Sequence, residues 1–321
     1  MSRTAMLMSL SALTPVHAGC SDKLGIIDLP IQREVHTSFP KIEASSLKGS
    51  IRHSLAKAGD ADLDDLFGPD NPKTEHHASA ISFSDARILF FPIKSVKGIF
   101  AWVTCPMVLE RFIEDLKLIL VSAPEEIEKI EVLKKAGSFL SKFEEGARIT
   151  QGSILEVEEK PSRVVLEEYL YETAKDHINE NGFTRFVEGI QVLLPDIGMP
   201  KDSLMKRAIL IPDAHFTDFV NQSTEVATRI KINSETGTVI NGALFNEEYL
   251  PSESILYSIV FADAIRVASE HDQRDTAKEI REKLNENQIF QIGANMTLGK
   301  GLVAITIVKA GDIIGGCESG K

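Results

Sequence analysis

The amino-acid sequence predicts an α+β fold built on a ferredoxin-like βαββαβ core, with a β-hairpin and helical insertions. Three observations lead to this prediction: a strand–helix–strand pattern near the amino terminus, a similar pattern near the carboxyl terminus, and a hairpin pattern just before the second one. Strands from the two ends of a chain can meet in one sheet, as they do in a ferredoxin-like core. Other α+β sheets fit the same periodicity.

The first strand and the first helix of the predicted core differ in their spacing of apolar residues. Residues 5–13 alternate partly between two faces, which is typical of a strand. In residues 45–58, Leu47, Ile51 and Leu55 lie four apart and share one face, so we expect a helix. A polar loop of residues 14–44 separates the two elements, and a loop this long is usually functional or disordered. Its prolines, glycines and apolar insert "LGIIDLPI" favour order.

The remaining elements follow from apolar runs, turns and helix starts. We expect strands at 79–92, 98–104, 254–262 and 301–308, helices from Pro106, over 124–146 and over 271–287, and a hairpin over 225–251 around the turn "SETG". The middle of the chain, 147–225, mixes strand and helix patterns. We interpret it as inserted material on a platform of the kind that binds single-stranded RNA.

Composition limits the protein classes that remain. The chain has 321 residues, a net charge of -12 and only three cysteines, which fits a reducing compartment without a disulfide framework. No run of about 18 apolar residues predicts a membrane span. The acidic balance argues against a general nucleic-acid binder, but RNA binding needs only a local basic stripe.

The segment "SALTPVHAGC" raises the alternative of a lipoprotein export signal ending at Cys20. Polar residues interrupt the apolar stretch, and His17 stands where such a signal needs a leucine-like residue. We therefore interpret the stretch as the first core strand, and expect a cytoplasmic protein without a membrane partner.

Three segments have patterns that fit chemistry on RNA. The loop "QIGANMTLGKG" (291–301) has glycines that permit close backbone approach, although it matches neither a P-loop nor a dinucleotide fingerprint. An ordinary glycine-rich turn fits it equally well. The segment "EASSLKGSIRH" (43–53) places Ser45 or Ser46 as a helix cap and Lys48 and Arg52 on one face. A capped helix with a solvated basic face is the simpler interpretation.

The third segment, 25–40, places Asp28 in a loop with Gln32, Arg33 and other polar residues. RNA cleavage by its own 2′-hydroxyl needs a base, an acid and cationic help at the phosphate. Asp28 can orient a base or hold a hydrated Mg²⁺, and His17 titrates in the range of acid–base work. A loop aspartate is more often a turn residue, and His17 can also simply fix the loop by a hydrogen bond.

Taken together and in this order, the motifs resemble the backbone subunits of the type III-B (Cmr) CRISPR–Cas effector complex, which belong to the repeat-associated mysterious protein (RAMP) superfamily. The matching segments are "LTPVHAG", "LGIIDLPIQREVHTSFP", "SSLKGSIR", "LFGP", "ISFSDARILFFPIKSVKGIFAWVTCPMVLERF", "RIKINSETGTV", "NEEYLPSESILYSIV" and "QIGANMTLGKG". The resemblance spans 7–309 and is weakest over 120–200.

The resemblance implies a single RAMP domain over 1–321. It consists of an RRM-like palm (5–104 and 253–309), insertions (106–220) and a thumb hairpin (222–252). It also implies an endoribonuclease that is active within an assembly. Copies stack head to tail along a guide RNA (crRNA) beside other Cmr subunits, and a complementary target RNA is cut at regular intervals with a divalent metal, Mg²⁺ or Mn²⁺.

Site residues carry over from the resemblance motif by motif. Asp28 matches the key cleavage aspartate, and His17, Glu247 and Tyr249 match positions of the same site. We expect Asp28 either to hold a metal-bound water or to position the 2′-hydroxyl. Lys48 and Arg52 match guide-contacting positions, and the loop 292–301 matches the glycine-rich loop of the superfamily. Together with the helix-start serines and the basic residues near 95, the expected RNA-binding positions are Ser45, Ser46, Lys48, Arg52, Lys94, Lys97, Gly293, Asn295, Thr297, Gly299, Lys300 and Gly301. Two departures are Ala294, where a glycine is usual, and Val35, where a charge is common.

We expect Lys48, Arg52, Lys94, Lys97 and Lys300 to form one contiguous basic groove. Two functions other than target cleavage remain open at this point: a non-catalytic RNA-binding scaffold, and a ribonuclease of the same superfamily that processes repeat RNA.

Overall fold

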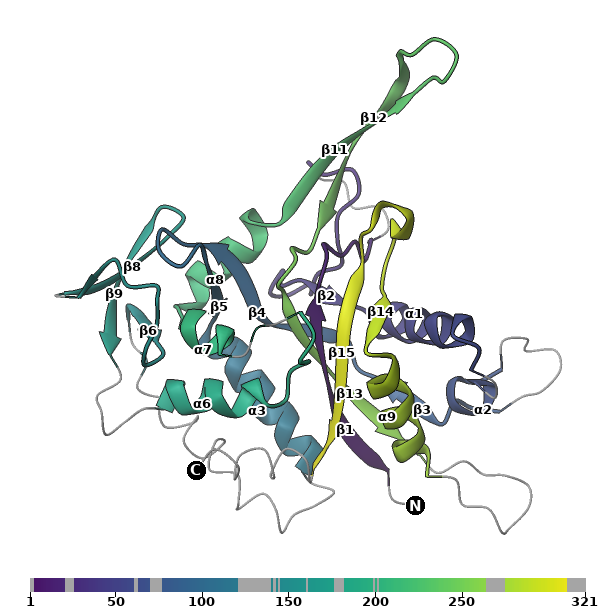
Figure 1. Cartoon of the computed structure of the whole chain (residues 1–321), viewed down its shortest axis with the longest axis horizontal. Helices are drawn as coiled ribbons and strands as arrows, with labels where there is room; N and C mark the ends of the chain where they lie inside the picture. Colours follow the sequence, from purple (N-terminus) through teal and green to yellow (C-terminus); the bar gives the residue numbers. More distant parts are fainter. Residues whose placement is uncertain are drawn as a thin grey trace.

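The computed structural model describes residues 3–20, 26–60, 63–69, 77–120, 140, 143, 145–159, 161–175, 182–198, 200, 202–263 and 275–310. The predicted helix at 124–146 falls mostly outside these residues, as does Cys317. Mixed α and β elements make up the described chain, as predicted (Figure 1).

The centre of the fold is an antiparallel sheet in which the amino-terminal strand is an inner strand. Its spatial order is β14-β15-β1-β13-β4, and every neighbouring pair is antiparallel. The bounds are β1 Thr4–Ala12, β4 Ala86–Lys94, β13 Ile255–Ala262, β14 Ile289–Gln291 and β15 Leu302–Lys309. Strands from both ends of the chain therefore meet in one sheet, as we expected.

Beyond β4 the sheet continues into the inserted part of the chain. The order runs β5-β10-β6-β9-β8-β7, with parallel pairing at β10–β5 and β6–β9. Bounds are β5 Phe100–Thr104, β6 Ala147–Ile149, β7 Glu158–Glu159, β8 Ser162–Leu166, β9 Tyr169–Lys175 and β10 Ala208–Leu210. Two short strands lie off this path: β2 (Lys41–Ile42) pairs with β4, and β3 (Ile81–Phe83) pairs with β13.

The single strand expected at 79–92 is wrong, because the chain breaks between β3 and β4. The hydroxyl of Ser84 accepts a hydrogen bond from the Ile259 amide at 2.8 Å, and Asp85 Oδ1 accepts one from the Ala44 amide at 2.9 Å. The two side chains satisfy a backbone amide within β13 and the first amide of the helix at 44–57, which competes with continuous strand pairing.

Helices lie on both sides of the β1–β15 strands (Figure 1). On one side are α1 Ala44–Lys57, α2 Leu63–Phe67 and α9 Thr276–Asn287; on the other are α3 Pro106–Leu120 and α6 Gly182–Gln191. Two further helices, α7 Ser203–Arg207 and α8 Asp213–Gln222, flank β10, and a 3₁₀ turn, η1 Met296–Leu298, precedes β15. In α1, Leu47, Ile51 and Leu55 are buried, as their spacing predicted.

Ser45 and Ser46 do not cap α1, contrary to the prediction. The cap position is Glu43, whose side chain makes no capping hydrogen bond, so both serines lie within the first turn. Asp85 satisfies the Ala44 amide instead, from a segment 41 residues further along the chain.

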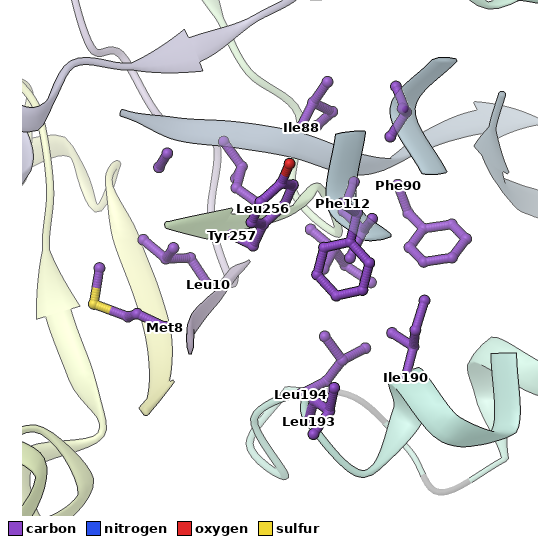
Figure 2. Packing of buried hydrophobic residues seen from close by; sticks show 14 of the residues in the cluster. Met8, Leu10, Ile88, Phe90, Phe112, Ile190, Leu193, Leu194, Leu256 and Tyr257 are labelled. Carbon is purple, nitrogen blue, oxygen red and sulfur yellow. The ribbon is translucent and has the colours of Figure 1, made fainter. Parts of the chain in front are cut away.

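The core explains why β1 alternates only weakly in polarity. Apolar side chains from β1, β4, β13, α3 and α6 pack against one another, including Met8, Leu10, Phe90, Phe112 and Ile190 (Figure 2). Residues Ala5 to Ala12 are all buried, so both faces of β1 are covered. Burial on both faces of β1 therefore explains the apolar stretch that the export-signal alternative was based on.

The predicted hairpin is present and projects away from the body of the molecule (Figure 1). Strands β11 (Glu225–Ile232) and β12 (Val239–Tyr249) pair antiparallel, with Arg229 opposite Phe245 and Ala227 opposite Glu247. None of the described helices is long and apolar enough to cross a membrane.

Candidate functional site

Three segments that are distant in sequence meet at the end of β12 that lies next to the body. Val16 forms an antiparallel bridge with Leu250, and Leu29 forms a parallel bridge with Glu247. The chain leaving β1 and the loop that carries Asp28 therefore both pair with β12. This pairing satisfies backbone groups that would otherwise be unpaired in a buried setting.

Asp28 lies at the surface of this junction. The Asn246 amide donates a hydrogen bond to Asp28 Oδ2 at 2.7 Å, and the Leu29 amide donates to the Asn246 carbonyl at 3.0 Å. The side chain is exposed, so its carboxylate can reach a ligand while one of its oxygens is oriented by the β12 backbone.

Glu248 anchors the loop that follows Asp28. Its buried carboxylate accepts hydrogen bonds from the Ile31 amide at 3.0 Å, from Arg33 Nη2 at 2.6 Å and from the Thr224 hydroxyl at 2.8 Å. The same Arg33 donates to the Val220 carbonyl at 2.9 Å. The order we expected for this loop is thus provided largely by one glutamate of the hairpin.

Gln32 connects the loop to the start of α1. Its amide nitrogen donates to the Gly19 carbonyl and to the Ser46 hydroxyl, both at 3.1 Å, and its carbonyl oxygen accepts from the Glu43 amide at 2.7 Å. The hydroxyl of Ser46 therefore contacts the loop inside the fold.

His17 is buried where the chain leaves β1. Its Nδ1 lies 2.7 Å from the Glu248 carbonyl oxygen, and its Nε2 lies 3.7 Å from Glu247 Oε1. A carbonyl oxygen can only accept, so Nδ1 carries the hydrogen and the neutral ring keeps its lone pair on Nε2. The hydrogen bond expected as the simpler role of His17 is present, and it directs Nε2 toward Glu247.

Glu247 and Tyr249 share a dense polar network. The Tyr249 hydroxyl donates to Glu247 Oε2 at 2.5 Å, Arg229 Nε donates to the same oxygen at 2.7 Å, and Asn295 Nδ2 donates to Oε1 at 2.6 Å. The Tyr249 ring lies edge-on to His17, with centroids 5.6 Å apart, and Lys300 Nζ lies 4.9 Å from its centroid.

This network shifts the pKa values of its members. Burial alone raises the pKa of Glu247, but hydrogen bonds from Tyr249, Arg229 and Asn295 and the neighbouring His17 lower it below its ordinary value of 4.5 overall. Burial and the hydrogen bond to Glu247 raise the pKa of Tyr249. Glu247 is therefore an ionised acceptor near neutral pH and Tyr249 a protonated phenol.

The glycine-rich loop lies directly against the backbone of His17, and Gly293 makes this close approach possible. A Cβ on Gly293 would lie 2.3 Å from the His17 carbonyl oxygen, and the Ala294 amide donates to that oxygen at 3.0 Å. Ala294 is not among the described residues with positive φ, whereas Asn295 is, at 65°. Position 294 therefore does not need the positive φ that would favour a glycine there.

The five basic residues do not form one groove. Lys48 donates to the Ser79 hydroxyl at 2.7 Å, and Arg52 pairs with Asp64 at 2.5 Å, both beside α1. Lys94 and Lys97 belong to a turn that is bonded to β8, because the amide of residue 96 donates to the Val165 carbonyl. In Figure 1, β8 and α1 lie at opposite ends of the view. Lys300 belongs to a third group at the hairpin base.

Metal ligands are sparse in the described part of the chain. It contains no group of three or more His, Cys, Asp or Glu side chains that could hold an ion. Asp28 is a lone exposed carboxylate, so the donor set fits a hydrated Mg²⁺ or Mn²⁺ only where RNA phosphate oxygens complete the coordination.

Sequence reasoning missed Arg229 and Glu248. The hairpin register carried a usable signal, because Arg229 and Glu247 fall on one face of the hairpin and Glu248 on the other. The register does not indicate that the face carrying Glu248 is covered by the loop at 28–33.

The known proteins that resemble this chain match it over most of its length. The model of the RAMP superfamily matches residues 9–304. The CRISPR system Cmr endoribonuclease Cmr4 of Pyrococcus furiosus is 37% identical over 308 residues, which is 94% of this chain and 95% of that protein. The CRISPR system CMR subunit Cmr4 of Saccharolobus solfataricus is 28% identical and covers 92% of this chain and 94% of its own length.

Solved structures agree with these relatives. The crystal structure of oligomeric Cmr4 from Pyrococcus furiosus superposes with a TM-score of 0.67 at 32% identity, covering 95% of this chain and 98% of that one. A chain of the Type III-B Cmr-beta cryo-EM structure in the apo state gives a TM-score of 0.73 at 22% identity, with the same coverage, and shows the shared fold. The chain therefore belongs to the RAMP superfamily and, within it, to the Cmr4 family.

Proposed function

We propose that this chain is a crRNA-binding backbone subunit of a type III-B effector complex and that it cleaves complementary target RNA at regular intervals. The 37% identical relative carries the name of a Cmr endoribonuclease over nearly the same length. The 32% identical crystal structure is described as oligomeric, which supports a stack of copies along one guide beside other Cmr subunits.

The strand order supports the finer description of the fold. In space the order is β15-β1-β13-β4, with α1 following β1 and α9 following β13 along the chain, which is the connectivity of a ferredoxin-like palm. The β11–β12 hairpin serves as the thumb, and the segment from α3 to α8 is the insertion. We treat the whole chain as one RAMP domain on this basis.

The observation that carries the proposed activity is the placement of Asp28. Its exposed carboxylate is held by the Asn246 amide at the base of the thumb, and the adjacent Leu29 pairs with Glu247, which belongs to the His17 network. A carboxylate there can position the 2′-hydroxyl of a bound RNA or hold a hydrated metal. A divalent ion, when bound, would neutralise charge at the phosphate.

The test uses the complex assembled with guide RNA and an end-labelled complementary target. Asp28→Asn keeps the shape of the side chain and its hydrogen-bond acceptor, but removes the charge. We expect the regularly spaced products to disappear while guide and target binding persist. Asp196→Asn, at an exposed aspartate far from this junction in sequence, is the matched control and should cut normally.

Other outcomes identify the other functions. A wild-type complex that binds target without cutting it, in the presence of Mg²⁺ or Mn²⁺, would leave the chain as a scaffold. Cleavage of repeat RNA by the isolated chain would instead indicate a processing ribonuclease. Normal cutting by Asp28→Asn would remove this carboxylate from the mechanism.

A further inference from the structure

We propose that Arg229 is a positioning residue of the cleavage site, acting through Glu247 and Tyr249 rather than by contacting RNA. This inference rests on the proposed function, since it assigns a role within the same reaction. Arg229 lies on β11, two residue pairs further out along the thumb than Glu247, and its side chain reaches back toward the body.

Arg229 contacts both members of the pair at once. Its Nε donates to Glu247 Oε2 at 2.7 Å, and its Nη2 donates to the Tyr249 hydroxyl. The charge of Arg229 also lies 5.8 Å from the centroid of the Tyr249 ring. These hydrogen bonds raise the pKa of the guanidinium further, so it is a permanent donor.

The donors around Tyr249 determine where its hydrogen points. Arginine and the asparagine NH₂ group can only donate, and both Arg229 and Asn295 donate to the Tyr249 oxygen, the latter at 3.0 Å. The phenol hydrogen is therefore directed to Glu247 Oε2. With Tyr249 and Glu247 both buried, neither has a free hydrogen or a free surface to offer RNA.

The locked pair in turn lies against two features of the site, the His17 ring and the backbone that holds Asp28. Glu247 Oε1 faces Nε2 of His17 at 3.7 Å. The β12 backbone on either side of Glu247 contacts the Asp28 loop: the Asn246 amide donates to Asp28, and the Glu248 amide donates to the Leu29 carbonyl at 3.0 Å. Loss of Arg229 would loosen the strand segment that orients both.

The experiment measures single-turnover cleavage of target by the full guide-loaded complex, at saturating complex, together with target affinity. For Arg229→Gln we expect a fall in cleavage rate of about 10- to 100-fold, the effect of a small misplacement of reacting groups, with target affinity unchanged. Arg229→Lys keeps the charge and one donor, and should recover part of the rate. Lys231→Gln removes a charge from an exposed position further out on β11, and should cut at the wild-type rate.

A double-mutant cycle tests whether Arg229 acts through Glu247. If it does, Arg229→Gln combined with Glu247→Gln should be no slower than the slower single variant, because both changes break the same contact. Multiplicative losses would overturn the proposal, and so would a loss of target affinity parallel to the loss of rate, which would make Arg229 an RNA contact.

The two proposals fail in different ways. A wild-type complex that does not cut contradicts the proposed function itself. A wild-type complex that cuts, alongside Arg229→Gln cutting at the same rate, contradicts only the role of Arg229. If Arg229→Gln lowers the yield of complex, Arg229→Lys provides the test, because it preserves the charge. Lysine does not reproduce the two-point contact that the guanidinium makes with Glu247 and Tyr249. Cutting at the wild-type rate by the Arg229→Lys complex would therefore contradict the positioning role.

Discussion

A Cβ on Gly293 would lie 2.3 Å from the carbonyl oxygen of His17, closer than any side-chain carbon can approach without a shift of backbone. Gly293 also has a φ of +79°, a conformation that favours glycine. The glycine-rich loop and the segment bearing His17 are thus in direct backbone contact, and the loop supports the site from behind.

Gly293→Ala should therefore both destabilise the protein and impair cleavage. Backbone strain at positive φ alone costs about 1 kcal/mol or more, and the clash with His17 adds to it. Urea denaturation of the purified chain gives the loss of stability, and target cleavage by the complex gives the loss of function.

Gly299→Ala is the control for that experiment. Gly299 has a φ of +69°, but a Cβ there would meet nothing within 4 Å. It should show the backbone strain without the clash, so an equal loss in both variants would show that contact with His17 is unimportant.

Glu248→Ala should release the loop that carries Asp28. The carboxylate is 2% exposed and accepts three hydrogen bonds, one from the mostly buried Arg33, so removal leaves a charge and an amide unpaired. Breaking a buried pair in this way typically costs about 3–5 kcal/mol. Limited proteolysis should show faster cleavage within residues 26–40, whereas Glu235→Ala, at an exposed position in the hairpin turn, should leave the digestion pattern unchanged.

Acidification should weaken the base of the thumb through Glu247. Because its pKa in the folded state lies below 4.5, the carboxylate stabilises the fold above that pH, and the contribution is lost as the pH falls through the folded-state pKa. Glu34 and Asp85 also have lowered pKa values, so their contributions to the stability of the fold are likewise lost on acidification.

Comparison with Glu247→Gln isolates the contribution of this one residue. The variant cannot titrate at position 247, so its unfolding free energy should fall less steeply than that of the wild type from about pH 5 to pH 3. Thermal or urea unfolding at a series of pH values measures the two slopes, and identical slopes would contradict the assignment.

Asp85 should act as a remote cap of α1. Asp85→Ala removes the acceptor for the Ala44 amide and the partner of Lys41 Nζ at 2.8 Å, and should cost about 1–2 kcal/mol. Asp85→Asn keeps an oxygen acceptor and should lose less, as measured by urea denaturation. Ser45→Ala, at the cap position that sequence alone suggested, should cost less than Asp85→Ala.

The elements that sequence predicted well are those governed by local spacing. The 225–251 hairpin depends on a turn and on alternation, and α1 depends on an apolar repeat of four, so neighbouring residues specify them. The family motifs also suggested His17, Asp28, Glu247 and Tyr249 as site residues, and the structure places three of these in one contact network.

The predictions that failed each depended on a partner distant in sequence. The cap of α1 comes from Asp85, and the break between β3 and β4 comes from contacts with α1 and β13. The expected basic groove failed because Lys48 bonds to Ser79 and Arg52 to Asp64, whereas the 94–97 turn lies beside β8.

The sequence by itself determined the residue types, the local periodicities and the family, and with them the expected chemistry on RNA. Only the tertiary structure decided which atoms meet: that Arg229 and Asn295 direct the Tyr249 hydrogen to Glu247, that Glu248 holds the loop, and that Gly293 packs on His17. The physical reason is that hydrogen bonds and close contacts act over a few ångströms, while most of the residues that make them here lie tens to hundreds of positions apart in the chain.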